Sequence, residues 1–230
     1  MQGPEVSRPC RDSRRPGILA FMFQSSDKSL IFLASASPRR SALLTQAGIA
    51  HEVRPVDIDE RPLPGEAAGH YVSRLAAGKA EVLWRTLDER QRRPVIGSDT
   101  SVVLDGEILG KPRDQADGRH MLERLSGRSH QVFTAVALRH AGGCESRLSV
   151  SEVTFRTLGQ AEIEAYWHSG EPHDKAGAYA VQGLAAIFIE RIAGSFSGIM
   201  GLPLYETAEL LRAIGYAPLG RRAVQDVSAA

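Results

Sequence analysis

The spacing of apolar and polar positions divides the middle of the chain into alternating strands and helices. Residues 30–34 form an apolar run of strand length. Ser37 then stands where a helix cap is expected, with Pro38 in the first turn and Gly48 at the end of the helix. Across residues 66–89 the apolar positions recur at intervals near three and four, which predicts a long amphipathic helix.

A short buried strand at 94–97 and a hairpin are predicted next. The runs 101–104 and 107–109 flank an Asp-Gly dipeptide at 105–106, which is typical of a two-residue hairpin turn. Asp99 is therefore expected at a junction between two strands, displayed at the end of an apolar one.

The rest of the pattern continues the alternation of helices and strands. The predicted helices are 114–125 (capped by Asp114), 161–167 and 203–214, and the predicted strands are 131–138, 147–156 and 186–191. Hairpins and crossover helices both occur, so the sequence predicts an α/β fold with a mixed sheet. Residues 1–29 are expected to be a disordered leader, with Met22 as an alternative start, and residues 217–230 a loose tail.

The composition is that of a globular chain without a strong charge of its own. Of its 230 residues, 43% are hydrophobic, which is enough for a substantial core in one domain or two small lobes. The 28 Lys and Arg residues nearly balance the 27 Asp and Glu residues, so no overall field favours nucleic acid or a membrane as a partner. No apolar run approaches the roughly 18 residues that cross a bilayer. Any attraction for an anion must therefore be local.

The two cysteines indicate a reducing compartment. Cys10 and Cys144 are far apart, and no pair stands at the spacing of a metal site. The histidines likewise show no spacing typical of a metal site or a Ser-His-Asp relay. We therefore expect a cytoplasmic protein without a disulfide or zinc framework.

Residues 35–40 (Ser-Ala-Ser-Pro-Arg-Arg) place hydroxyl groups and two cations at the start of the first predicted helix. The first turn of a helix exposes unpaired N–H groups and a partial positive charge, which favour a phosphate. The hydroxyls of Ser35 and Ser37 and the guanidinium groups of Arg39 and Arg40 would complete such a site. An ordinary helix cap with two solvated arginines is the alternative, so the motif alone does not decide.

Carboxylates from two parts of the chain form a second candidate site. Asp57, Asp59 and Glu60 lie close together in sequence, and Asp99 follows an apolar run. Such groups, brought together, bind Mg²⁺ or Mn²⁺, which bridges phosphate oxygens and activates water. Solvated loop charges are the alternative for Asp57 and Asp59. Burial and neighbouring cations can tune Asp99 into a base or a ligand.

Two lysines and a glycine-rich stretch complete the candidates. Lys111 precedes Pro112, a rigid place for a point charge aimed at phosphate. Lys79 is expected off the apolar stripe of its helix, where a snorkelling lysine is the alternative. In residues 174–183 small side chains let the backbone approach a ligand, and Gln182 can bind a base edge as donor and acceptor. An ordinary Gly-rich turn is the alternative for this stretch.

Seven segments taken together resemble the Maf family, and they cover residues 30–216. In order they are 33–40, 71–76 with 79–80, 97–100, 110–112, 125–127 with 130–132, 174–179 and 201–204. The resemblance implies a nucleoside triphosphate pyrophosphatase with an elongated, twisted mixed sheet flanked by helices, and two lobes around a nucleotide-binding cleft. Two features depart from the family: Gly-Ile-Met at 198–200 is less polar than usual, and residues 1–29 have no counterpart.

The resemblance also implies a role for each matching position. Asp99 is the proton acceptor that activates water for attack on the α-phosphorus, and Glu60 joins Asp99 in binding a divalent metal, Mg²⁺ or Mn²⁺. The implied phosphate-contacting residues are Ser35, Arg40, Lys79 and Lys111. The positions that vary with the substrate are Arg39, Thr100 and Gln182.

These last three residues resemble the subgroup that acts on dTTP and UTP, whereas the 7-methyl-GTP subgroup tends to carry Trp, Gln and Glu at the same positions. Phosphoryl transfer needs positioning and charge neutralisation more than a covalent nucleophile, which agrees with this set of residues. We therefore expect a pyrophosphatase for dTTP and UTP, with modified pyrimidine nucleotides as further candidate substrates. Other non-standard nucleotides, a nucleotide-binding regulator of cell division without turnover, and a homodimer stay open.

Overall fold

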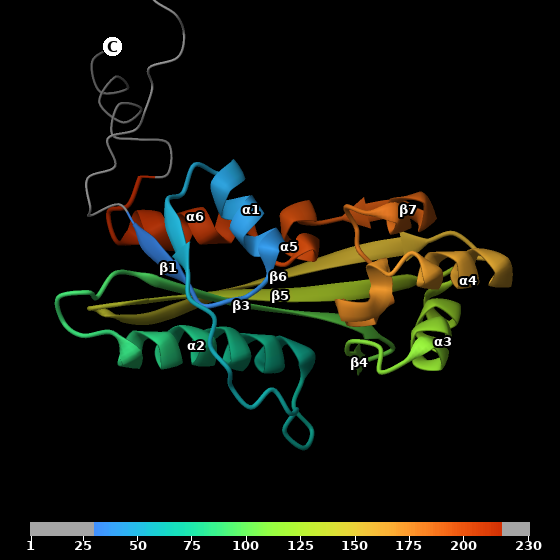
Figure 1. Cartoon of the computed structure of the whole chain (residues 1–230), viewed down its shortest axis with the longest axis horizontal. Coiled ribbons are helices and arrows are strands. Elements are labelled where there is room, and N and C mark those ends of the chain that lie inside the picture. Colours follow the sequence, from blue (N-terminus) through green and yellow to red (C-terminus); the bar gives the residue numbers. More distant parts are fainter. Residues whose placement is uncertain (1–29, 218–230) are drawn as a thin grey trace, which may run out of the picture.

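A seven-stranded mixed sheet forms the centre of the computed structural model, which describes residues 30–217 (Figure 1). Its strands are β1 (Ile31–Leu33), β2 (His51–Val53), β3 (Val95–Leu104), β4 (Glu107–Leu109), β5 (Ser129–His140), β6 (Gly143–Phe155) and β7 (Ile189–Ala193). Their order is β2-β1-β3-β5-β6-β7, with β4 against β3; β1 is parallel to its neighbours and the other pairs are antiparallel. The predicted α/β fold with a mixed sheet is confirmed. The leader predicted at 1–29, and all but the first residue of the tail predicted at 217–230, lie outside the described residues.

Helices cover both faces of this sheet (Figure 1). The α-helices are α1 (Pro38–Gln46), α2 (Ala68–Thr86), α3 (Gln115–Leu125), α4 (Gln160–His168), α5 (Phe196–Met200) and α6 (Leu204–Ala213). Short 3₁₀ helices are η2 (Glu171–Asp174), η3 (Ala176–Ala178) and η4 (Leu184–Phe188). α2 runs along one face, α1, α5 and α6 lie on the other, and α3 and α4 lie at one end of the long strands. No helix of the described chain is both long and apolar enough to cross a bilayer.

The core consists of three buried clusters. Two of them lie on opposite faces of the sheet in one lobe, and the third forms the other lobe. One cluster packs α2 against β1 and β3 and includes Phe32 and Trp84. A second lies on the opposite face, where Leu44 of α1 and Leu210 of α6 are buried. The third joins α3 and α4 to the far ends of β3, β5 and β6 around Phe155. These three long strands run through both lobes and hold them together in one sheet.

Most predicted elements are present, with small shifts in their ends. α1 and α2 lie within the predicted ranges, and the final helix is α6. The hairpin turn at 105–106 has φ angles of 54° and 81°, the left-handed conformation that a two-residue turn of this type requires. Asp114 caps α3 as predicted, because its carboxylate accepts the N–H of Asp117 at 2.8 Å.

The predicted position of Asp99 at a strand junction is wrong. β3 continues without a break from Val95 to Leu104, so Asp99 lies in the middle of a strand. Small and polar residues at 97–101 interrupt the apolar pattern, but the pairing with β5 continues through them. The strand expected at 186–191 begins only with β7 at Ile189, because η4 precedes it. β2 and α5 are not predicted by the pattern.

α2 packs closely against β3 at Gly97. A Cβ atom at this position would lie 2.1 Å from the carbonyl oxygen of Ala76 and 2.8 Å from the backbone nitrogen of Ala80. A residue without a Cβ atom is therefore needed for the helix to come so close to the strand. Side chains two residues apart on a strand share a face, so this contact also brings Lys79 of α2 beside Asp99.

Gly97→Ala is expected to lower the free energy of unfolding by about 1–3 kcal/mol, the usual cost of over-packing a core, because the added methyl group meets helix backbone. Urea denaturation measures this change. Gly110→Ala is the matched control, since nothing lies within 4 Å of its added Cβ atom. Equal unfolding free energies for the two variants would contradict the close packing of α2 on β3.

Candidate active site

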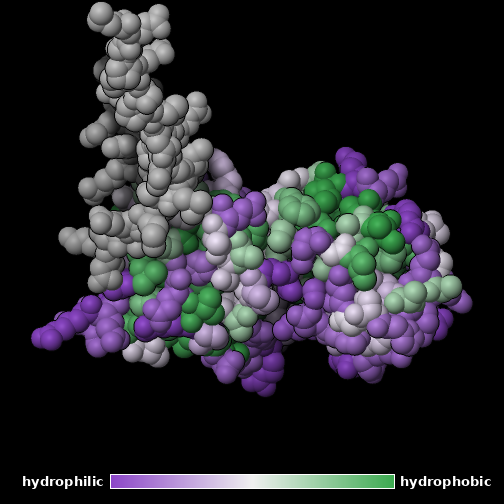
Figure 2. All heavy atoms as spheres, turned by 45° about the horizontal axis from the view of Figure 1, so that its top comes forward, coloured by the Kyte–Doolittle hydropathy of each residue, from purple (hydrophilic) through white to green (hydrophobic). Residues whose placement is uncertain are grey.

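A gap in strand pairing opens one edge of β3. β1 pairs with residues 95–96 and β4 with residues 102–104, and no described strand pairs with residues 97–101 on that side. A cavity of about 740 Å³ lies over this gap. Figure 2 shows hydrophilic side chains in the hollow between the two lobes. Asp99 and Thr100 point to opposite faces of the strand, and both line the cavity because the edge between them is open.

Every residue to which the family resemblance assigns a role lines this cavity. These residues are Ser35, Arg39, Arg40, Glu60, Lys79, Asp99, Thr100, Lys111 and Gln182. Of the other acidic candidates, Asp57 also lines the cavity, whereas Asp59 is paired with Arg61 on the surface. A solvated loop charge is therefore the correct interpretation of Asp59.

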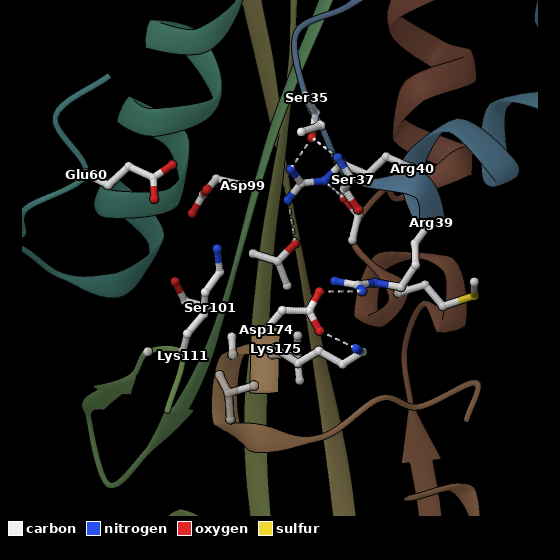
Figure 3. A pocket seen from close by; sticks show the side chains of 18 of the residues that line it. Ser35, Ser37, Arg39, Arg40, Glu60, Asp99, Ser101, Lys111, Asp174 and Lys175 are labelled. Atoms are coloured by element: carbon white, nitrogen blue, oxygen red, sulfur yellow. Dashed lines mark hydrogen bonds and ion pairs between the residues drawn. The ribbon is translucent and has the colours of Figure 1, made fainter. Parts of the chain in front are cut away.

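The ammonium group of Lys79 is bonded to two carboxylates of the cavity. Its Nζ lies 2.7 Å from Asp99 Oδ1 and 2.6 Å from Glu60 Oε1, and Figure 3 shows these two carboxylates facing one another. Lys79 is buried against β3, so its expected place off the apolar stripe of α2 is wrong. The carboxylates replace the water that the ammonium loses on burial, which allows a lysine here. The Tyr71 hydroxyl, which donates to the carbonyl oxygen of Glu60 at 2.8 Å, holds the loop before α2 in place.

Burial and the shared lysine act differently on the two carboxylates. Asp99 is the more buried of the pair, and burial raises its pKa above the usual value against the opposing charges of Lys79 and Arg40. Glu60 is more exposed. Burial acts to raise its pKa, but the hydrogen bond and charge of Lys79, together with the charges of Lys111 and Arg40, lower the pKa below the usual value. Asp99 is therefore the better proton acceptor of the two.

Arg40 links α1 to the open edge of β3 (Figure 3). Its Nη1 donates to Ser35 Oγ at 2.9 Å, its Nε to the Gly201 carbonyl oxygen at 2.8 Å, and its Nη2 to Thr100 Oγ1 at 3.4 Å. Burial lowers the pKa of the guanidinium, although the charge of the nearby carboxylates opposes this. Ser37 stands at the cap position before α1 as predicted, but its side chain makes no capping bond. The first N–H groups of α1 therefore stay available to an anion.

The cations at the mouth of the cavity differ in how far they are neutralised. Arg39 Nη1 lies 3.8 Å from Asp174 Oδ2, and Lys175 Nζ donates to Asp174 Oδ1 at 2.5 Å. Lys111 has no hydrogen bond or ion pair with any described residue, and Figure 3 shows its side chain directed toward Asp99. Its charge is thus available to a phosphate group.

Glu60 and Asp99 form a donor set that fits a divalent cation bound together with a phosphate. Mg²⁺ takes oxygen ligands and is usually held by one or two carboxylates plus substrate phosphates. Both carboxylates point toward the same place, and the ammonium group of Lys79 is bonded to both of them there. Within the described part of the chain, no group of three or more His, Cys, Asp or Glu residues could hold a metal ion by itself. A metal bound here would therefore need oxygen atoms of the substrate.

Comparison with known proteins shows the family to which the chain belongs. Residues 30–214 match the family described as Maf-like protein. The chain belongs to the Maf family. A relative from Bordetella parapertussis named dTTP/UTP pyrophosphatase is 50% identical over 199 residues, which cover 84% of this chain and 96% of the relative. One of the same name from Nitrosomonas europaea is 51% identical over 195 residues, covering 80% of this chain and 94% of the relative.

One solved structure that is similar to this Maf-family chain is so at much lower identity. The structure of the Staphylococcus aureus Ham1 protein has a TM-score of 0.45 at 14% identity, over 80% of this chain and 97% of that one. This similarity is too low to support an argument about the site.

Several residues that support the Maf cavity carry no signal in the sequence pattern. Tyr71 fits the apolar stripe of α2, and its bond to Glu60 cannot be foreseen because the partner lies in a loop of irregular structure. Lys175 belongs to a segment with family resemblance, but its Nζ is taken up by Asp174 and by the Glu171 carbonyl oxygen at 2.8 Å. Such bonds depend on how loops pass one another, which local periodicity does not determine.

A buried histidine supports one wall of the Maf cavity. His130 Nε2 lies 2.8 Å from the hydroxyl of Tyr179, which lines the cavity. The rings of His130, Phe155 and Tyr179 meet edge to face, with centroids 4.9 to 5.4 Å apart. Burial lowers the pKa of His130 to about 4, so the imidazole is neutral near pH 7.

Acid is expected to destabilise the protein through His130. The imidazole titrates near pH 6.5 in the unfolded chain and near pH 4 in the folded one, so the unfolded chain binds more protons between these values. The free energy of unfolding is therefore unaffected by this histidine above about pH 6.5, and it falls by about 3 kcal/mol as the pH is lowered toward 4. Urea unfolding of the wild type and of His130→Gln between these pH values measures the effect.

The variant should lose less stability than the wild type over this pH range, because its amide does not titrate. His168→Gln is the control, since His168 is exposed, and it should follow the wild type. The same pH dependence in all three proteins would contradict the role of His130.

Proposed function

We propose that this Maf-family chain hydrolyses dTTP and UTP to the nucleoside monophosphate and pyrophosphate. The observation that carries the proposal is Asp99, a buried carboxylate in one cavity with Arg40, Lys79 and Lys111. The relatives named dTTP/UTP pyrophosphatase support the choice of substrate, because they are about half identical to this chain over most of their length. The proposal needs no covalent nucleophile, because phosphoryl transfer depends mainly on the positioning of the reacting groups and on the neutralisation of charge.

Asp99 acts as the general base in this proposal. Its carboxylate accepts a proton from water, and the water oxygen forms a bond to the α-phosphorus. The bond from the α-phosphorus to the oxygen that bridges to the β-phosphate breaks, and pyrophosphate leaves with that oxygen. A raised pKa brings Asp99 closer to the range in which a base works well near neutral pH.

Cations from two elements neutralise the phosphates. Arg40 is held in one orientation by Ser35 and Gly201, so little reorganisation is needed when an anion binds. Lys111 makes no hydrogen bond or close ion pair with a described residue, and it follows the end of β4. When bound, Mg²⁺ or Mn²⁺ supplies further charge neutralisation at the phosphates, and Glu60 and Asp99 are the residues that would hold it.

Arg39, Thr100 and Gln182 select the nucleobase in this proposal. Thr100 Oγ1 accepts hydrogen bonds from Arg40 and, at 3.1 Å, from Thr134 Oγ1, so its hydroxyl is oriented. Gln182 offers both a donor and an acceptor, which suits the edge of uracil or thymine, where an N–H lies between two carbonyl groups. Modified pyrimidines that keep this edge are further candidate substrates. We also propose a cytoplasmic location, in keeping with the cysteine pattern.

Purified protein with Mg²⁺ or Mn²⁺ is expected to release pyrophosphate from dTTP and UTP faster than from 7-methyl-GTP or ITP. In ¹⁸O-labelled water the label should enter the monophosphate, because water attacks the α-phosphorus. A chelator should abolish turnover. A preference for 7-methyl-GTP would overturn the proposed base selection, and tight binding of nucleotides without any product would overturn the enzyme in favour of a binding protein.

A further inference from the structure

The turn that carries Gln182 lies between η3 and η4. It is closed by the N–H of Gly183, which donates to the carbonyl oxygen of Ala180 at 3.0 Å. Gln182 lines the cavity and its side chain is exposed. An exposed glutamine has many rotamers, so the path of the backbone decides which part of a ligand its amide can reach.

The carboxylate of Glu171 lies directly against this turn. Its Oε2 accepts the N–H of Leu184 at 2.9 Å and its Oε1 accepts the N–H of Ala185 at 3.3 Å, which satisfies the first N–H groups of η4. A Cβ atom at Gly183 would lie 2.1 Å from Oε2. The turn therefore depends on this carboxylate for its hydrogen bonds and on glycine for the close approach.

Tyr166 of α4 joins the other end of the turn to the same carboxylate. Its hydroxyl donates to Glu171 Oε1 at 2.8 Å and accepts the N–H of Ala180 at 3.2 Å. Tyr166 is buried, and its ring packs edge to face on Phe188 at 5.2 Å between centroids. Both ends of the turn are thus bonded to one pair of side chains, and neither member of the pair is among the residues that line the cavity.

We infer that Glu171 and Tyr166 are positioning residues for nucleobase selection, which act on the substrate through Gln182. This inference rests on the proposed function. A preorganised turn binds its ligand with less ordering cost, and a shift of about 1 Å in a positioning group can cost about 10²-fold in activity. The phosphate contacts of Arg40 and Lys111 come from other elements, so the effect falls on the base and not on the phosphates.

Two variants remove these bonds with little change of shape. Glu171→Gln replaces one acceptor oxygen by an NH₂ group, which cannot accept the N–H or O–H groups that face it. Tyr166→Phe keeps the ring on Phe188 and removes both bonds of the hydroxyl. Glu164→Gln is the matched control, because Glu164 lies on α4 like Tyr166 but its carboxylate is bonded to Gln115 on the surface.

We expect KM for the nucleotide to rise, while kcat and the inhibition constant of pyrophosphate stay close to the wild-type values. In Glu171→Gln and in Tyr166→Phe, KM for dTTP should rise about 10-fold, while kcat and the inhibition constant of pyrophosphate change less than about threefold. Glu164→Gln should behave as the wild type. Unchanged KM values in both Glu171→Gln and Tyr166→Phe would overturn the inference. A general loss of stability would lower the apparent kcat, because less of the protein is folded, and would leave KM and the inhibition constant of pyrophosphate unchanged.

A double-variant comparison shows whether Glu171 acts through Gln182. In a Gln182→Ala background, Glu171→Gln should raise KM for dTTP no further than about twofold, because the group it positions is gone. The same fold increase in both backgrounds would overturn the inference. If Glu171→Gln does not fold, Tyr166→Phe replaces it in this comparison. No turnover by the wild type would overturn the proposed function and this inference together, whereas turnover with additive changes overturns the inference alone.

Discussion

The ion pairs of Lys79 with Asp99 and Glu60 are the interaction on which the site depends. Two carboxylates in a partly buried cavity repel one another unless a cation lies between them. The ammonium of Lys79 supplies that cation from the buried face of α2, at 2.7 Å and 2.6 Å from the two acids. The helix can present a lysine there only because Gly97 lets α2 approach the strand that carries Asp99. The packing of α2 on β3 therefore both stabilises the fold and places Lys79 beside the two acids of the cavity.

The open edge of β3 turns this contact into a cavity. Because no described strand covers residues 97–101 on that side, side chains from both faces of β3 reach the same space. Asp99 faces the helix that carries Lys79, whereas Thr100 faces Arg40 of α1. The proposed base and the proposed metal ligands therefore lie on one side of the strand, and Arg40, the proposed phosphate contact, lies on the other. A substrate placed across the edge would contact both sets.

Much of the fold is predicted from the sequence, but β2 and α5 are missed and Asp99 and Lys79 are misplaced within their elements. Periodicity predicts α2, the hairpin at 105–106 and the cap at Asp114, because these signals are local. Asp99 and Lys79 have the residue types of a strand end and a helix surface, yet each lies in the interior of its element. Their burial is permitted by partners that are distant in sequence, and a pattern along the chain contains no information about such partners. The family resemblance supplies the residues of the site, and only the structure shows which of them touch.

The turnover rate of Asp99→Asn tests the account most directly. The amide keeps the shape of the side chain and cannot accept the proton, so kcat for dTTP should fall about 10²- to 10⁴-fold. The variant should stay folded, because Glu60 remains an ion-pair partner of Lys79 and the amide oxygen at position 99 can still accept a hydrogen bond from the ammonium group. Asp59→Asn is the control, since Asp59 is paired with Arg61 outside the cavity, and it should keep the wild-type rate. A folded Asp99→Asn protein that turns over dTTP at the wild-type rate would contradict the role of Asp99 as the base.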